Sequence, residues 1–200
     1  NLNSADLTSA DLSDTFWYQA NLSYVNLSNV DLTNADLSTT SVTSEDIVVF
    51  RATTAGDYSS GTFTVVLDQF TDAQVRGLSL VESDTFVGDT TLSKGSFLFS
   101  QNNGATRLEN SIYVYTPTDA GVNTAGTFQL LIDGLELDSQ IDARVSGLEL
   151  IESATTIGTA SLTTGQILVT TANNATVGQN LLSVAENDIF VLSVTETSID

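Results

Sequence analysis

Residues 1–44 are organised with a period of five. The central position of each five-residue unit is apolar, and the position two before it is small or β-branched. The central positions are Leu2, Leu7, Leu12, Trp17, Leu22, Leu27, Leu32, Leu37 and Val42. A period of five fits neither an α-helix nor a β-strand, so a straight element would scatter these side chains over every face. The backbone must therefore turn once per repeat and wind around its own apolar side chains.

Written in fives, the segment reads ADLTS, ADLSD, TFWYQ, ANLSY, VNLSN, VDLTN and ADLST. These units resemble the A(D/N)LXX pattern of the pentapeptide-repeat family. The resemblance implies a right-handed quadrilateral β-helix with four repeats per coil, and therefore about two coils in residues 1–44. It also implies a structural core made of Leu12, Leu22, Leu27, Leu32 and Leu37. Trp17 departs from the pattern and is expected to distort one corner or to cover the base of the coil.

A coil of so few turns leaves an open end on each side. Each repeat buries its apolar face only against its neighbours, and an open end carries unpaired backbone groups. We expect the rest of the chain to cover one end. The chain begins inside the repeat pattern, which suggests a piece of a larger polypeptide, so upstream coils or another molecule are expected to cover the other end. The expected assembly surface there comprises Asn1, Leu2, Leu7 and Trp17.

Residues 45–200 contain a longer repeat. DIVVFRATTAGDYSSGTFTVVLD (46–68) aligns without a gap on SIYVYTPTDAGVNTAGTFQLLID (111–133). Residues 75–100 align in the same way on residues 145–170, and ENDIFVLSV, which begins at Glu186, starts the first motif again. The segment therefore predicts two homologous units, about 46–110 and 111–187, and a final strand at 188–195.

Each unit contains β-rich runs separated by turns of Gly, Asn, Asp and Thr. Neither unit shows a long amphipathic helical period. We expect strands near 46–52, 61–68, 76–82, 96–100, 111–116, 126–133, 146–152, 166–171 and 188–195. The equivalent residues Phe63 and Phe128 are predicted to lie in the core. The segment is predicted to be all-β.

The arrangement of these strands has three alternatives. Four short strands per repeat is the count of a β-propeller blade, and the segment resembles the tandem GTFxLxxDG modules of large bacterial surface proteins. Two units cannot close a propeller, so we favour a β-sandwich or a blade-like tandem-repeat β domain. Alternatively, the strands complete a sheet in a neighbouring subunit.

The composition excludes several classes of function. The chain has no Cys and no His, which excludes thiol and Ser-His catalysis, zinc sites of the usual kind and disulfides. Twenty-five acidic residues against five basic ones give a net charge of −20. That charge repels phosphate backbones and anionic membranes, so we expect no nucleic-acid partner and no membrane insertion. The cofactor is expected to be none, or calcium.

The expected calcium ligands are Asp residues at or near predicted strand ends, where loop oxygens can gather around the ion. The candidates are Asp68, Asp72, Asp133, Asp138 and Asp142. Neither an EF-hand loop nor a glycine-rich calcium nonapeptide is present. A solvated acidic face is therefore favoured over any single calcium site.

One carboxylate pair recurs in both units, as Asp68 with Glu82 in the first and as Asp133 with Glu152 in the second. Paired carboxylates could act as acid and base on a glycoside. Catalytic sites are rarely duplicated in every repeat, however, and the only Trp lies in the five-residue repeats. We therefore predict a protein that is not an enzyme.

These observations favour a secreted or cell-surface structural protein, a subunit of a filament, sheath or adhesin that binds copies of itself. Head-to-tail contacts would use the end of the β-helix and strand edges, with Ile189 and Val191 on the last strand. The alternative is a cell-surface binding module for a glycan or another surface protein. An inhibitor that mimics DNA, as some pentapeptide-repeat proteins do, is the least favoured alternative.

Overall fold

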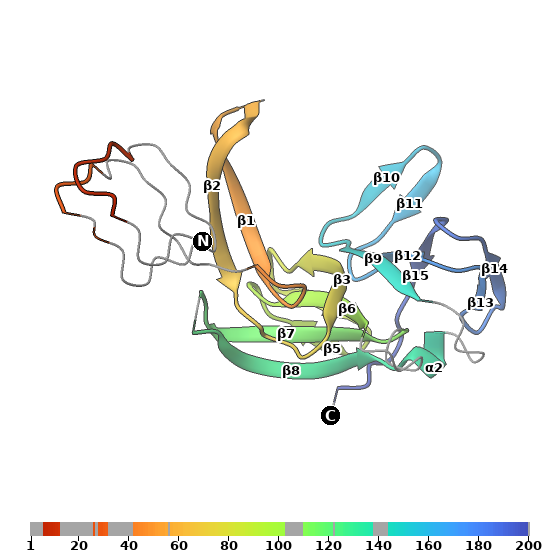
Figure 1. Cartoon of the computed structure of the whole chain (residues 1–200). Helices are drawn as coiled ribbons and strands as arrows, with labels where there is room; N and C mark the ends of the chain where they lie inside the picture. The colour runs from red at the N-terminus through yellow and green to blue at the C-terminus, as the bar shows by residue number, and fades with distance from the viewer. Residues whose placement is uncertain are drawn as a thin grey trace. The chain divides into compact units, whose positions relative to one another are not determined.

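The computed structural model describes residues 6–12, 26, 28–31, 42–55, 57–102, 110–121, 123–137 and 144–199. The chain divides into two compact units, Asn1–Thr43 and Ser44–Asp200. The sequence places the same boundary one residue later. The described residues are all-β apart from one short helix, as predicted (Figure 1). The described part of the chain contains no helix with the length and apolar character needed to cross a membrane.

The first unit shows backbone pairing between residues 20 positions apart. Parallel bridges join Asp6 to Asn26 and Asp11 to Asp31. The Leu7 amide donates to the Asn26 carbonyl at 3.0 Å. This offset equals four five-residue repeats per coil, which is the number that the pentapeptide-repeat resemblance implies.

A side-chain turn recurs in this unit. The Thr8 amide donates to Oδ1 of Asp6 at 3.0 Å, and the Ser28 amide donates to Oδ1 of Asn26 at 3.1 Å. Hydrogen bonds from the hydroxyl and amide of Thr8 hold the pKa of Asp6 below its ordinary value. Asp6 and Asn26 thus each fix the corner that follows them.

Of the predicted core leucines, Leu12 is half-buried, as is Leu7 of the predicted assembly surface. Their neighbours along the repeat lie outside the described residues: Asn1, Leu2, Trp17, Leu22, Leu27, Leu32 and Leu37. The predicted core and end of the coil are therefore only partly described.

The second unit contains fifteen described strands and one helix. The strands of its first half are β1 (Ile47–Thr54), β2 (Asp57–Leu67), β3 (Gln74–Leu80), β4 (Thr85–Val87), β5 (Thr90–Leu92), β6 (Phe97–Asn102), β7 (Ile112–Asp119) and β8 (Ala125–Ile132). The second half comprises α2 (Gly134–Leu137), β9 (Val145–Leu150), β10 (Thr155–Ile157), β11 (Ala160–Leu162), β12 (Ile167–Thr171), β13 (Ala175–Val177), β14 (Leu182–Val184) and β15 (Ile189–Leu192).

These strands form small, separate antiparallel sheets. The largest has the order β3-β6-β7-β8, and a three-stranded sheet has the order β15-β12-β9. Four hairpins stand as two-stranded sheets: β1–β2, β4–β5, β10–β11 and β13–β14. The described residues therefore form neither a single two-sheet sandwich nor a closed propeller.

The first sequence repeat is also a repeat of strand pairing. Phe50 pairs with Phe63 in the β1–β2 hairpin, and Tyr115 pairs with Phe128 in the β7–β8 hairpin. In both hairpins an aromatic ring lies over a glycine of the partner strand. A Cβ on Gly61 would lie 2.5 Å from the Phe50 ring. The two halves of the unit therefore share one hairpin geometry.

The last strand, β15, also has a counterpart in the preceding repeat. In the four-stranded sheet Phe97 pairs with Tyr115, and in the three-stranded sheet Ile167 pairs with Leu192. Because Phe97 aligns with Ile167 in the sequence repeat, β15 is the counterpart of β7. The structure thus supports the reading that residues from Glu186 onward start the first motif again.

Cross-strand pairing divides each sheet into two faces, since paired residues point to the same side. In the four-stranded sheet, face I carries Phe97, Phe99, Tyr113 and Tyr115, and face II carries Leu98, Ile112 and Val114. In the three-stranded sheet the counterparts are Ile167, Val169, Phe190 and Leu192 on face I, and Leu168, Ile189 and Val191 on face II. In the β1–β2 hairpin they are Val48, Phe50, Phe63 and Val65 on face I, and Ile47 and Val49 on face II.

Two hydrophobic clusters connect these faces. In the smaller cluster, Ile47 and Leu67 of the hairpin pack on face I of the four-stranded sheet. In the larger cluster, face II of the four-stranded sheet shares a core with face I of the three-stranded sheet. Both internal contacts therefore join face II of one repeat to face I of the next.

Two predicted core residues are not buried. The Phe63 side chain is 68% exposed and the Phe128 side chain is 43% exposed. Phe63 lies on face I of the β1–β2 hairpin, which no other described repeat covers. Phe128 lies on the edge strand β8, where its ring meets those of Phe99 and Tyr113 at 5.4 and 5.0 Å. The core prediction was wrong for both.

The three short hairpins differ in their surroundings. Val87 of β4–β5 and Val177 of β13–β14 are buried, whereas the equivalent Ile157 of β10–β11 is 59% exposed. Thr197 holds the first hairpin, because its amide donates to Oδ1 of Asp89 at 3.0 Å. The β10–β11 hairpin projects from the unit, as does the β1–β2 hairpin (Figure 1).

Candidate functional site

The predicted calcium ligands do not form a cluster in the described structure. No group of three or more Asp or Glu side chains in the described ranges is placed to hold a metal ion, and Asp68, Asp72 and Asp133 therefore form none. Asp133 instead caps helix α2, since the Leu135 amide donates to its Oδ1 at 3.0 Å. Asp138 and Asp142 lie outside the described residues.

Glu82 and Glu152 occupy equivalent positions of the two repeats and are joined by a hydrogen bond. Equivalent positions of the two repeats lie side by side, and the Glu152 carboxylate accepts hydrogen bonds from the Glu82 amide and from Ser83. The Ser83 amide donates at 2.6 Å and its hydroxyl at 2.7 Å. Partial burial opposes the charged form of Glu152, but these hydrogen bonds outweigh it and lower the pKa. Glu152 thus joins one repeat to the next.

Replacing Glu152 with glutamine is expected to lower the free energy of unfolding at pH 7 by about 1–2 kcal/mol, because charge-assisted hydrogen bonds are lost. The folded-state pKa of Glu152 is depressed, so its contribution is present above about pH 4.5 and is lost as the pH falls through the folded pKa. Urea unfolding at pH 7 and pH 3 should show the difference between wild type and variant shrinking at the lower pH.

The matched control for this prediction is Glu82→Gln. Glu82 occupies the equivalent position of the preceding repeat and is exposed to solvent. Its replacement is expected to change the free energy of unfolding by no more than about 0.5 kcal/mol. Equal losses in the two variants would show that Glu152 does not connect the repeats.

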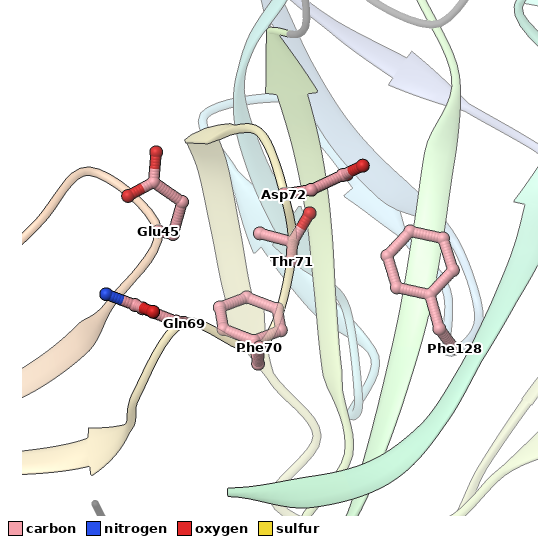
Figure 2. Close-up of a pocket in the computed structure, with 6 residues that line it drawn as sticks. All are labelled: Glu45, Gln69, Phe70, Thr71, Asp72 and Phe128. Carbon is pink, nitrogen blue, oxygen red and sulfur yellow. The ribbon is translucent and has the colours of Figure 1, made fainter.

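A pocket of about 770 Å³ lies beside the smaller hydrophobic cluster. Figure 2 shows the rings of Phe70 and Phe128 with Thr71 and Asp72 between them in this view. The remaining lining residues are Glu45 and Gln69. The Phe70 ring also packs against Phe99 and Tyr115, at 5.1 and 5.0 Å. The pocket therefore combines fixed aromatic surface with polar groups that can form hydrogen bonds.

The other candidate site is face II of the three-stranded sheet. Ile189 is 71% exposed, whereas its counterpart Ile112 in the preceding sheet is fully buried. Val191 is 39% exposed, and its counterpart Val114 is 3% exposed. The same positions are thus core in one repeat and surface in the next, because no further described repeat covers the last sheet.

The edge of this sheet is open as well. β15 stands at the end of the order β15-β12-β9, and no other described strand pairs with its second edge. A hollow of about 720 Å³ runs beside it and is lined partly by exposed Leu135, Leu181 and Leu182. An apolar edge strand of this kind favours association with another strand or sheet.

Face I of the β1–β2 hairpin is the second uncovered apolar surface. The rings of Phe50 and Phe63 lie 4.8 Å apart, and Phe63 is largely exposed. Val48 and Val65, which pair with each other on the same face, are half-buried. Besides the predicted surface at Ile189 and Val191, the second unit therefore has an aromatic surface whose exposed residue, Phe63, was predicted to lie in the core.

The comparisons with known proteins concern the first unit. The family model of pentapeptide repeats matches residues 1–38 with eight copies. No curated protein and no solved structure matches the chain. The matched residues agree with the repeat pattern read from the sequence and with the 20-residue offset of the parallel bridges. The N-terminal segment of this chain therefore consists of pentapeptide repeats.

Proposed function

We propose that this chain is a non-enzymatic structural protein of the cell surface or extracellular space that assembles head to tail with copies of itself. The observation that carries the proposal is the open apolar sheet at Ile189 and Val191, whose counterparts in the preceding repeat are buried. An array that ends on such a surface gains by adding another layer, since burial of apolar area is the main favourable term in association.

The first unit fits the same role. The match to pentapeptide repeats and the 20-residue offset support a short quadrilateral β-helix with four repeats per coil. A coil stacks on further coils by the same parallel pairing that connects its own turns. Within this proposal, the segment serves as a stacking or spacer element.

The test is the solution mass of the full chain at increasing protein concentration. Light scattering in 0.5 M NaCl, with and without calcium, is expected to show a mass that rises steadily with concentration. Salt is included because each molecule carries a net charge of −20, and screening weakens the repulsion between copies. A monomer at every concentration in both solutions would contradict the proposal.

A second candidate is a binding module for a glycan, and the pocket in Figure 2 favours it. Aromatic rings stack on sugar faces, and the carboxylates of Asp72 and Glu45 can accept hydrogen bonds from sugar hydroxyls. Binding of an oligosaccharide on a glycan array, abolished by Phe128→Ala and weakened by Asp72→Asn, would support this function. An array without a positive signal would rule it out for the sugars tested.

A further inference from the structure

The repeats of the second unit pack by one rule. The end of face II of the β1–β2 hairpin that carries Ile47 lies on face I of the four-stranded sheet, whereas Val49 on the same face is 48% exposed. Face II of the four-stranded sheet lies on face I of the three-stranded sheet. The first of these contacts places aliphatic Ile47 and Leu67 on aromatic side chains such as Phe99. The rule is directional, and exposed apolar side chains lie at both ends of the described array: Phe63 on face I of the hairpin, and Ile189 and Val191 on face II of the three-stranded sheet.

The two uncovered faces are complementary in kind. Ile189 and Val191 on face II of the three-stranded sheet are exposed and aliphatic. Phe50 and Phe63 on face I of the hairpin are aromatic, and Phe63 is 68% exposed. An aliphatic face II would thus meet an aromatic face I, as in the smaller internal cluster.

One carboxylate, and no pair of like charges, lies among the paired residues of the two faces. Among the residues assigned to the two faces, neither the Val48 and Val65 pair nor the Leu168 and Val191 pair carries a charge. Glu149 pairs with Leu168 on β9, so this exposed carboxylate lies on face II of the three-stranded sheet as well. Val48, Phe50, Phe63 and Val65 on face I of the hairpin carry no charge, so Glu149 meets no like charge among them. The net charge of the whole molecule is therefore the main repulsive contribution.

We propose that face II of the three-stranded sheet in one molecule packs on face I of the β1–β2 hairpin in a second copy of this chain. The inference rests on the proposed self-assembly and names the surfaces that perform it. Because the two surfaces differ, each added molecule presents a new open face, and the assembly grows as an open chain when the rotation between molecules does not close a ring. The contact continues the internal packing rule from one molecule into the next.

The experiment uses two variants of the full chain, each with one face blocked. Ile189→Asp with Val191→Asp places charge on face II, and Phe63→Asp places charge on face I. All three side chains are exposed, so both variants are expected to fold, which circular dichroism and thermal unfolding verify. In sedimentation velocity each variant alone is expected to be a monomer, whereas the wild type forms larger species.

Mixing the two variants in equal amounts is the decisive step. The intact face II of one can bind the intact face I of the other, so the mixture is expected to double in mass and then stop growing. Ile157→Asp is the matched control, because Ile157 is equally apolar and 59% exposed but lies on neither face. This control is expected to assemble like the wild type.

The outcomes separate this inference from the proposed function. A wild type that stays monomeric would overturn both. A wild type that assembles while Phe63→Asp assembles equally well, or a mixture that stays monomeric, would overturn the pairing of these two faces and leave self-assembly standing. If Ile157→Asp abolished assembly, the pairing of these two faces would also be overturned, because the contact would then lie elsewhere.

Discussion

Replacing Ile112 with alanine is expected to lower the free energy of unfolding by about 2–5 kcal/mol, because its side chain is fully buried and leaves a cavity. Ile112 lies on face II of the four-stranded sheet, in the larger cluster that also contains Ile167 and Phe190 of the next sheet. The loss corresponds to a fall in melting temperature of about 2–4 °C per kcal/mol for a domain of this size. Urea and thermal unfolding, monitored by circular dichroism, measure it.

The control is the same substitution at Ile189, the counterpart of Ile112. Its side chain is 71% exposed, so Ile189→Ala is expected to change the free energy of unfolding of the monomer by less than about 1 kcal/mol. The two isoleucines thus share a position in the repeat, but Ile112 is covered by another layer and lies on an inner strand, whereas Ile189 lies on an uncovered edge strand. Equal losses at both positions would contradict the assignment of the open face.

Replacing Gly165 with alanine is expected to lower the free energy of unfolding by about 2–4 kcal/mol. Gly165 has a φ of +87°, which disfavours alanine, and a Cβ there would lie 2.2 Å from the Phe86 carbonyl oxygen. The backbone of the β4–β5 hairpin would have to move away from the turn, since the clash is with main chain and not with a flexible side chain. Urea unfolding of the full chain measures the loss.

Gly95 provides the matched control for this variant. It occupies the equivalent turn of the first repeat, with a φ of +86°, and a Cβ there would have no atom within 4 Å. Gly95→Ala is therefore expected to lower the free energy of unfolding by only about 1 kcal/mol, which is the cost of placing alanine at a positive φ. A loss at Gly95 as large as that at Gly165 would show that the close approach of Phe86 is not a feature of the folded molecule.

The repeat structure could be predicted from the sequence, because equivalent residues recur at fixed spacing and fold alike. Phe50 and Tyr115 align in the sequence and pair with equivalent partners in the two hairpins. The strand expected near 166–171 is β12, Ile167–Thr171. Alternation and turn residues were sufficient for these elements, since both are local properties of the chain.

The short hairpins were missed. β4–β5, β10–β11 and β13–β14 have strands of three residues, which is too short for alternation to be visible. Their signal is a glycine with positive φ after an apolar residue, as at Val87 and Gly88 or Ile157 and Gly158. Helix α2 was also missed, because four residues carry no helical period.

Burial could not be predicted from the strand pattern alone. Phe63 and Phe128 sit in strands of the right type, yet both are exposed, because exposure depends on which layer covers each face. The same cause separates Ile112 from Ile189. Likewise, the sequence suggested carboxylate pairs of Asp68 with Glu82 and of Asp133 with Glu152. The role of Glu152 in joining the repeats follows only from the side-by-side placement of Glu152 and Ser83.

Head-to-tail assembly is tested most directly by negative-stain electron microscopy of the full chain, concentrated in 0.5 M NaCl. Thin, unbranched fibres of variable length are the expected result, because unlike faces meet at every contact and each end stays open when the rotation between molecules does not close a ring. Fibres should be absent from grids of the Phe63→Asp variant at the same concentration. Discrete particles of one uniform size in the wild-type sample would contradict open head-to-tail assembly.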